Sequence, residues 1–183
     1  TLEGSQAAGG ISVRTGGLIV GAAADGSALL RGNVDIGAGA RLQGKGTIDG
    51  NARVSRDATL QLQAASAALR VKGDLHLDPG ARLNVPLDAT SRLPALIVDG
   101  KMTVEGASLH VDAEDGDWRP NERVDLLRSG AVDGRFSAVD TNLAFLTPTP
   151  EYTSQGIALV MRRNQVSFVD LARTPNQKSV AGS

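Results

Sequence analysis

Alternating apolar positions around a glycine recur five times in the first 110 residues. Each copy has an apolar residue two positions before the glycine and two more at two and four positions after it, as in Leu30-x-Gly32-x-Val34-x-Ile36. Side chains two apart share one face of a β-strand, so each copy predicts a strand with one buried face. A further leucine follows each copy. The glycines and these leucines are Gly9, Gly32, Gly50, Gly73 and Gly100, and Leu18, Leu42, Leu60, Leu83 and Leu109.

The spacing of the copies indicates a stack of repeats. Successive glycines lie 23, 18, 23 and 27 residues apart. Self-similarity at about 20 residues with an internal period of two is typical of a β-solenoid, in which each repeat is one turn of coiled strands. A glycine that recurs at one phase suits a corner of such a coil, where a Cβ would clash. We therefore expect the five glycines to lie in one column at a corner.

The composition changes after residue 111. All five aromatic residues come after residue 117, and the repeats contain none. Large rings bury much area, which suits a cap over the exposed end of a solenoid. We predict an all-β fold with solenoid turns in residues 1–111, a β-rich cap in residues 112–165 and a flexible linker in residues 166–183. The predicted core of the cap is Trp118, Leu126, Phe136, Phe145, Tyr152 and Leu159.

The predicted cap has longer and less periodic strands than the repeats. The pattern favours extended segments at residues 124–127, 132–139 and 157–162, with turns at Ser129-Gly130 and Gln155-Gly156. Two prolines in residues 146–150 lack the N–H that an interior strand donates. We expect that segment to lie at a sheet edge or to form a loop.

Charge and composition exclude several classes of protein. The net charge is −1, so nothing suggests the basic surface of a nucleic-acid-binding protein. Cysteine is absent, which excludes disulfides and thiol chemistry. No stretch approaches the length of an apolar transmembrane helix. The sequence starts at Thr1 without a start methionine or signal peptide, and we expect it to be part of a longer protein.

No residue pattern defines a catalytic, cofactor or metal site, and we predict none. The segment 39–45 resembles a phosphate-binding loop, but Gly46 replaces the required Ser or Thr. His76 and His110 alternate with apolar neighbours, so both are expected to point outward into solvent. Asn33 and Asn51 share one repeat phase and could form a structural ladder. One acidic group could hold a hard cation but lacks the spacing of calcium loops: Asp112, Glu114, Asp115 and Asp117.

The most specific string in the sequence is Leu42-Gln-Gly-Lys-Gly-Thr-Ile-Asp-Gly-Asn51. It resembles a string near the C-terminal end of autotransporter passenger domains, the secreted part of type V secretion proteins in Gram-negative bacteria. Pro79-Gly80 comes one repeat later than in the family pattern, which leaves the strand register near residue 60 open. The other matching strings follow in the family's order and are 73–83, 124–127, 132–136, Tyr152, 159–164 and 172–181.

The resemblance implies a right-handed parallel β-helix that ends in an autochaperone region, here residues 112–165. In such proteins this region emerges first through the outer membrane and templates the preceding turns at the cell surface. The implied location is the bacterial cell surface or the medium, reached through the periplasm and outer membrane, with a role in virulence. The implied partners are the rest of the passenger, the translocator β-barrel, the outer-membrane assembly machinery and a host surface. We expect a monomer with no nucleic-acid partner.

Two other functions remain as alternatives to this folding module. An adhesin stem that binds host glycans or matrix would need an exposed aromatic or charged strip, and the repeats contain no aromatic residue. A polysaccharide-active β-helix would need acidic and basic residues clustered on one face, whereas the charges are scattered along the sequence. We predict that the chain is not an enzyme and that any activity of a longer parent lies upstream of Thr1.

Overall fold

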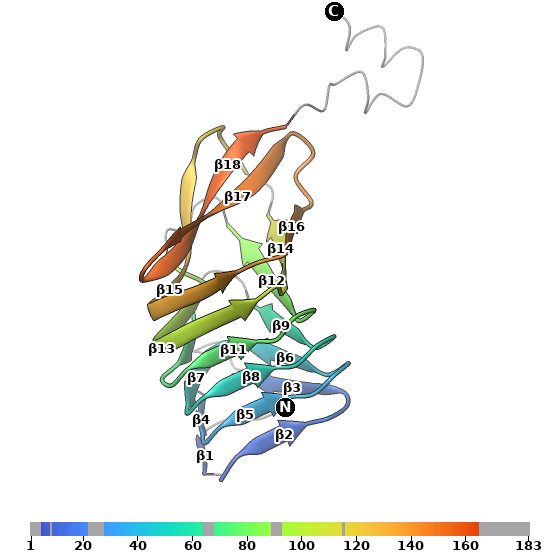
Figure 1. Cartoon of the computed structure of the whole chain (residues 1–183), viewed down its shortest axis with the longest axis vertical. Helices are drawn as coiled ribbons and strands as arrows, with labels where there is room; N and C mark the ends of the chain where they lie inside the picture. Colours follow the sequence, from blue (N-terminus) through green and yellow to red (C-terminus); the bar gives the residue numbers. More distant parts are fainter. Residues whose placement is uncertain are drawn as a thin grey trace, which may run out of the picture.

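The computed structural model describes residues 5–7, 9–21, 28–63, 68–88, 93–114 and 116–164. Among these residues every regular element is a β-strand, and most strands are paired in parallel (Figure 1). An all-β fold built on parallel sheets is therefore confirmed. Within the same ranges no helix is long or apolar enough to cross a membrane. The predicted linker, residues 166–183, lies outside the described residues.

From β4 to β13, each strand pairs with the strand three before it in the sequence, so the chain forms three columns of stacked strands (Figure 1). The first column contains β1 (Ser5–Ala7), β4 (Leu29–Arg31), β7 (Gly46–Asp49), β10 (Leu69–Val71) and the start of β13 (Leu96–Glu105). The second contains β2 (Ile11–Val13), β5 (Val34–Ile36), β8 (Ala52–Val54), β11 (Leu75–Leu77) and the end of β13. The third contains β3 (Gly17–Val20), β6 (Arg41–Gly44), β9 (Thr59–Leu62), β12 (Arg82–Leu87), β14 (Ser108–Ala113) and β16 (Ala138–Thr141).

We call one passage of the chain through the three columns a rung. Rungs 1 to 4 each comprise three consecutive strands, from β1–β3 to β10–β12. Rung 5 comprises β13 and β14, because β13 spans both the first and the second column. This arrangement is consistent with the predicted parallel β-helix.

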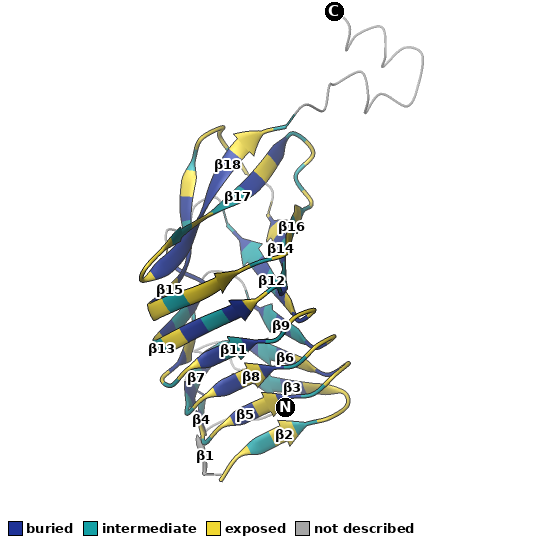
Figure 2. Ribbon diagram, viewed as in Figure 1, coloured by how far each residue is buried: buried dark blue, intermediate teal, exposed yellow. Residues whose placement is uncertain are grey.

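The interior of the stack follows the predicted parity. In the second to fifth repeats, all three apolar positions around the glycine are buried, from Leu30 to Val104. The additional leucines also face inward and form a single row, because Leu42 pairs with Leu60, Leu60 with Leu83 and Leu83 with Leu109. This row settles the register near residue 60, and the interior remains in register across the Pro-Gly turn. Figure 2 shows the resulting alternation of buried and exposed positions along the strands.

The parallel stacking continues beyond residue 111. The long strand β15 (Arg123–Arg135) runs parallel to β13, and β16 runs parallel to β14, so these two strands form a sixth rung. Ser129-Gly130, predicted as a turn, lies inside β15, so that prediction was wrong. The predicted strand at 132–139 is split between β15 and β16, since Gly134 has a left-handed φ of 81° and Phe136 leaves the sheet.

An antiparallel hairpin follows the sixth rung. Its strands are β17 (Leu146–Thr153) and β18 (Gly156–Arg163), and β18 also pairs antiparallel with the first half of β15. β17 has no other strand partner among the described residues, so the segment with Pro148 and Pro150 lies at a sheet edge, as predicted. The tight turn between the two strands lies within one residue of the predicted one.

Aliphatic residues, rather than aromatic ones, fill the centre of the hairpin region. Of the predicted cap core, Leu126 and Leu159 are fully buried at 0% exposure. Trp118, Phe136 and Tyr152 are half-buried and pack against the rim of the core, and Phe145 is also half-buried. The rings therefore pack against the core from its rim, and the aliphatic members of the predicted set lie inside it. The interior of the coil is filled by rows of Leu, Val and Ile, and the hairpin continues these rows with Ile157, Leu159 and Met161.

Candidate functional site

The repeat glycines form a column between the first and second columns of strands. Gly73 N–H donates to the carbonyl of Gly50 at 3.0 Å, and Gly100 N–H donates to that of Gly73 at 3.2 Å. A Cβ on Gly50 would meet the backbone of Gly32. Gly130 of rung 6, which the repeat pattern did not include, continues the column above Gly100. Gly9 has no neighbouring atom within 4 Å of an added Cβ, so the structure records no close approach at the first repeat.

The predicted bend at the glycine occurs only in the lower rungs. In rungs 2 to 4 the glycine separates two short strands, whereas β13 and β15 run through Gly100 and Gly130 without interruption. A bend in the chain is therefore not the reason why a glycine recurs at this position in every rung. Gly50, Gly73 and Gly100 also have no left-handed φ. What they share is the close approach of the rung below.

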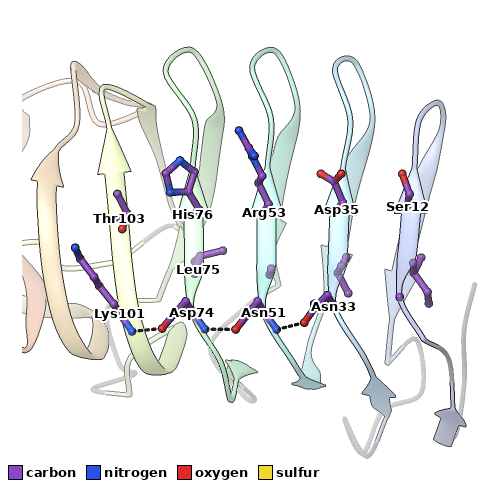
Figure 3. A pocket seen from close by; sticks show the side chains of 14 residues that line it. Ser12, Asn33, Asp35, Asn51, Arg53, Asp74, Leu75, His76, Lys101 and Thr103 are labelled. Carbon is purple, nitrogen blue, oxygen red and sulfur yellow. Dashed lines mark hydrogen bonds between the residues drawn. The ribbon is translucent and has the colours of Figure 1, made fainter.

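A ladder of polar side chains lies next to the glycine column. Asn33 Oδ1 accepts the N–H of Asn51 at 2.9 Å, Asn51 Oδ1 accepts that of Asp74 at 2.9 Å, and Asp74 Oδ1 accepts that of Lys101 at 2.8 Å (Figure 3). Each of these residues directly follows a repeat glycine. The expected ladder of Asn33 and Asn51 thus exists, but its bonds run from side chain to backbone, and Asp74 extends it.

Glycine and the ladder depend on each other sterically. Asn51 Oδ1 reaches the next rung through the space beside Gly73, and a Cβ on Gly73 would meet that oxygen. The same holds for Asp74 Oδ1 and Gly100. A Cβ at either position would also lie 2.8 to 2.9 Å from the backbone of the glycine below. The repeated Gly-Asx pair is therefore one structural unit that joins successive rungs.

A shallow groove of about 570 Å³ lies along the outer face of the second column. Its outer row places one side chain from each rung in register: Ser12, Asp35, Arg53, His76 and Thr103. These residues all lie three positions after a repeat glycine, so the repeat pattern already contained this row. Sequence reasoning considered only His76 among them, because the other four are ordinary surface residues when considered singly.

Ion pairs connect the groove to the adjacent turn. Arg53 forms a forked contact with Asp78, with Nη2 at 3.0 Å, and His76 Nε2 lies 3.0 Å from the same carboxylate. The hydrogen bonds that Arg53 donates to the Asp78 carboxylate raise the pKa of Arg53. Lys101 Nζ lies 2.7 Å from Asp133 in rung 6, and this pair raises the pKa of Lys101 and lowers that of Asp133. Some of the charges that are scattered along the sequence thus pair on this face, whereas other ion pairs, such as Arg70 with Asp99 and His110 with Asp140, lie on the other columns.

The two histidines point outward as predicted, but each has a carboxylate partner. His76 contacts Asp78 and lies 3.9 Å from Glu105. His110, on the third column, has Nδ1 3.0 Å from Asp140. Neither histidine is therefore simply solvated. The two lie on different columns and do not form a common site.

The rim of the cap holds the aromatic residues. Tyr152 Oη accepts the N–H of Phe136 at 3.0 Å, and the Arg135 guanidinium lies 5.0 Å from the Tyr152 ring centroid. Burial raises the pKa of Tyr152. Trp118 Nε1 donates to the carbonyl of Glu114 at 2.8 Å. These contacts fix the segments that lead into and out of the hairpin.

The other candidate sites do not come together. The segment 39–45 forms a turn and β6, and no helix follows it, so it has no phosphate-binding geometry. Asp112, Glu114 and Asp117 are exposed, and Asp115 lies outside the described residues. Within the described ranges, no three His, Cys, Asp or Glu side chains gather in a way that could hold a metal ion.

The chain has a distant similarity to a known extracellular protein. The chain is 28% identical over 159 residues to an extracellular serine protease of Serratia marcescens, and this match covers 81% of the chain. The chain spans only 15% of the length of that protein. No protein-family model matches the chain. The similarity links the chain to a region of an extracellular protein and assigns no activity to it.

Proposed function

We propose that this chain is the C-terminal stem of a secreted autotransporter passenger, a right-handed parallel β-helix whose last part folds first and seeds the rungs before it. The chain acts as a structural and folding module, and this role requires no catalytic residue. Its partners in this proposal are the preceding rungs of its own passenger and the translocator barrel. The extracellular nature of the Serratia relative supports a secreted or cell-surface location.

The observation that carries the proposal is the difference between the two ends of the stack. Among the described residues, β1, β2 and β3 of rung 1 each have one strand neighbour, in rung 2. At the other end, β15 has β13 on one side and β18 on the other. The C-terminal end is thus closed over the first column by an antiparallel hairpin, while each strand of rung 1 is paired on one side only and can receive a further rung on the other.

Growth from the closed end has a clear physical basis. A rung that forms alone loses the conformational entropy of closing a long loop and gains few hydrogen bonds. A rung that docks on a folded neighbour gains backbone hydrogen bonds and a buried apolar layer at the same time. The Gly-Asx pairs add one hydrogen bond between successive rungs, and this bond forms only when the two rungs are aligned in the native register. The N–H of the residue after the glycine donates to the Asx Oδ1 of the preceding rung, so this bond forms only when that rung has docked. A folded rung therefore presents a defined donor to the rung that joins it.

The test is the surface display of the full-length parent protein carrying variants of this chain. Leu159→Ala removes a fully buried side chain from the hairpin, and Leu18→Ala removes a buried side chain from rung 1. We expect Leu159→Ala to reduce the amount of folded, protease-resistant passenger at the cell surface several-fold, and Leu18→Ala to leave it nearly unchanged. Equal loss with both variants, or a greater loss with Leu18→Ala, would overturn the seeding role.

A further inference from the structure

An apolar pocket lies at the rim of the cap, at the end of the last strand. Its volume is about 290 Å³, far more than the roughly 30 Å³ that one water molecule occupies. The wall comes from the segment before β15, from the connection between β16 and β17, and from the end of β18. The pocket can therefore hold an apolar side chain. Its larger lining residues are Trp118, Pro120, Leu143, Phe145, Leu146 and Arg163.

The indole of Trp118 is held in place but not fully covered. Its Nε1 donates to the carbonyl of Glu114 at 2.8 Å, and the residue is half-buried. Because this nitrogen is the one polar atom of the indole, the ring surface that stays exposed is apolar. Covering such a surface with another apolar group is favourable. The pocket thus offers a fixed ring to an apolar partner.

The described part of the chain reaches this pocket with its last residues. Arg163, at the end of β18, faces Leu146 across the hairpin and lines the pocket (Figure 1). Asn164 N–H then donates to the carbonyl of Phe145 at 3.0 Å, and Asn164 Nδ2 donates to that of Ala144 at 3.0 Å. At Asn164 the chain therefore still runs beside the pocket wall.

The sequence after Asn164 supplies side chains that match the pocket. Residues 165–169 read Gln-Val-Ser-Phe-Val, and in an extended chain Val166 and Phe168 share one face. Antiparallel pairing that continues from Leu146 and Arg163 would place Val166 opposite Leu143. An extended residue spans at most about 3.6 Å, so Phe168 lies within about 14 Å of Asn164. Both apolar side chains can therefore reach the pocket.

We propose that residues 165–168 of this chain dock in the pocket, with the Phe168 ring against Trp118 and Val166 against Leu143. A short tether gives an effective concentration on the order of millimolar, so this segment has the advantage over a free apolar peptide or a second copy. The docked segment fixes the point at which the chain leaves the cap, and a flexible linker then begins after Phe168. This docking needs only the chain itself and does not depend on the seeding role.

The experiment is tryptophan fluorescence of the whole 183-residue chain. Trp118 is the only tryptophan in the sequence, so its emission reports on this pocket directly. Phe168→Ser should shift the emission to longer wavelength and raise its quenching by acrylamide about twofold, because water and quencher then reach ring surface that Phe168 covered. Phe168→Leu should restore most of the protection, since an aliphatic side chain still covers the ring.

Val180→Ser is the matched control. It also replaces an apolar residue of the C-terminal sequence by serine, but Val180 lies outside the docking segment and the emission should stay unchanged. Unchanged fluorescence in Phe168→Ser would overturn the proposal, as would equal changes in Phe168→Ser and Val180→Ser. Protection of Trp118 that is lost when the unaltered chain is diluted would assign the pocket to a second copy and would also overturn it.

A second measurement keeps Phe168 in place. The chain contains no cysteine, and facing residues of an antiparallel pair have Cα atoms about 4.5–5.5 Å apart, within the range of a disulfide. Leu143→Cys combined with Val166→Cys should therefore form an intramolecular disulfide on oxidation. Leu143→Cys combined with Val180→Cys should form much less. The absence of a disulfide in the first pair, or equal yields in the two pairs, would contradict the docking.

Discussion

The parallel rungs and the C-terminal hairpin solve the same problem, the burial of an apolar face, in different ways. In the rungs, each strand is covered by an almost identical strand above and below, with Leu42, Leu60 and Leu83 in one row. In the hairpin, β18 runs antiparallel to the first half of β15, and within the described residues its other neighbour is β17. The rungs therefore define a surface that a similar rung can extend, whereas the hairpin ends the extension over the first column.

The edges of the two regions show the same contrast. The outer strand of the hairpin, β17, contains Pro148 and Pro150, which cannot donate to a neighbouring strand. Rung 1 contains no proline in β1, β2 or β3. Ile11 and Val13 of rung 1 are half-buried, although the equivalent residues of the later rungs are buried. The hairpin edge over the first column thus resists extension by a further strand, whereas the edge of rung 1 lacks this protection.

The largest expected effect comes from the core of the hairpin. Leu159→Ala leaves a cavity where a side chain is 0% exposed, and such changes cost about 2–5 kcal/mol. Denaturant unfolding should show a clearly lower midpoint. Leu93→Ala is the control, because Leu93 is 67% exposed and surface changes stay within about 0.5 kcal/mol. Equal midpoints for the two variants would show that the hairpin does not belong to the cooperative unit.

The next effect tests the glycine column of the rungs. Gly73→Ala places a Cβ against Asn51 Oδ1 and the backbone of Gly50, and overpacking of this kind costs about 1–3 kcal/mol. Gly9→Ala meets no atom within 4 Å and should be nearly neutral. Thermal unfolding of the two variants compares a stacked with an unstacked repeat glycine. A neutral Gly73→Ala would contradict the close approach of the rungs.

A smaller effect is expected in the polar ladder. Asn51→Ala removes the acceptor for the N–H of Asp74 and should cost about 1 kcal/mol, the usual net value of one hydrogen bond. The amide of Asp74 should also exchange faster with solvent. Asn84→Ala, which breaks a side-chain pair with Gln61 on the third column, should leave that amide unchanged. Unaltered exchange at Asp74 in Asn51→Ala would show that the ladder bond is not formed.

The smallest effect concerns the rim of the hairpin and appears only in alkali. Burial raises the pKa of Tyr152 in the folded chain above its usual value of about 10. The folded chain then holds this proton more tightly than the unfolded chain does. The corresponding stability is complete below the unfolded pKa and is lost as the pH rises through the folded pKa. Unfolding midpoints should fall as the pH rises above about 10, and Tyr152→Phe should reduce that fall. The same fall in both chains would remove Tyr152 as its cause.

The sequence predicted the interior of the rungs well, because burial on one face imposes a period of two that survives loops of different length. The pairing of Leu60 with Leu83 required the structure, since turn lengths vary between repeats. The sixth rung was missed because Arg128 stands where the other repeats have an apolar residue, although Gly130 and Val132 keep the pattern. The position of the aromatic residues was also not predictable, because the width of the coil decides whether a ring fits inside.

The groove was invisible for a related reason. Asp35, Arg53 and His76 are separated by about 20 residues each and share only a phase within the repeat. Their alignment follows from strand register, which adds one outward residue per rung. Only the stacking turns these separate surface residues into one row.

The most direct test of the proposed seeding is pulsed hydrogen exchange during refolding of this chain from denaturant. The account predicts that amide groups of β15, β17 and β18 become protected first, followed by the rungs in order from β13 back to β2. Leu159→Ala should delay protection throughout the chain. Protection that begins in rungs 1 to 3, or that is complete there before the hairpin forms, would contradict the account.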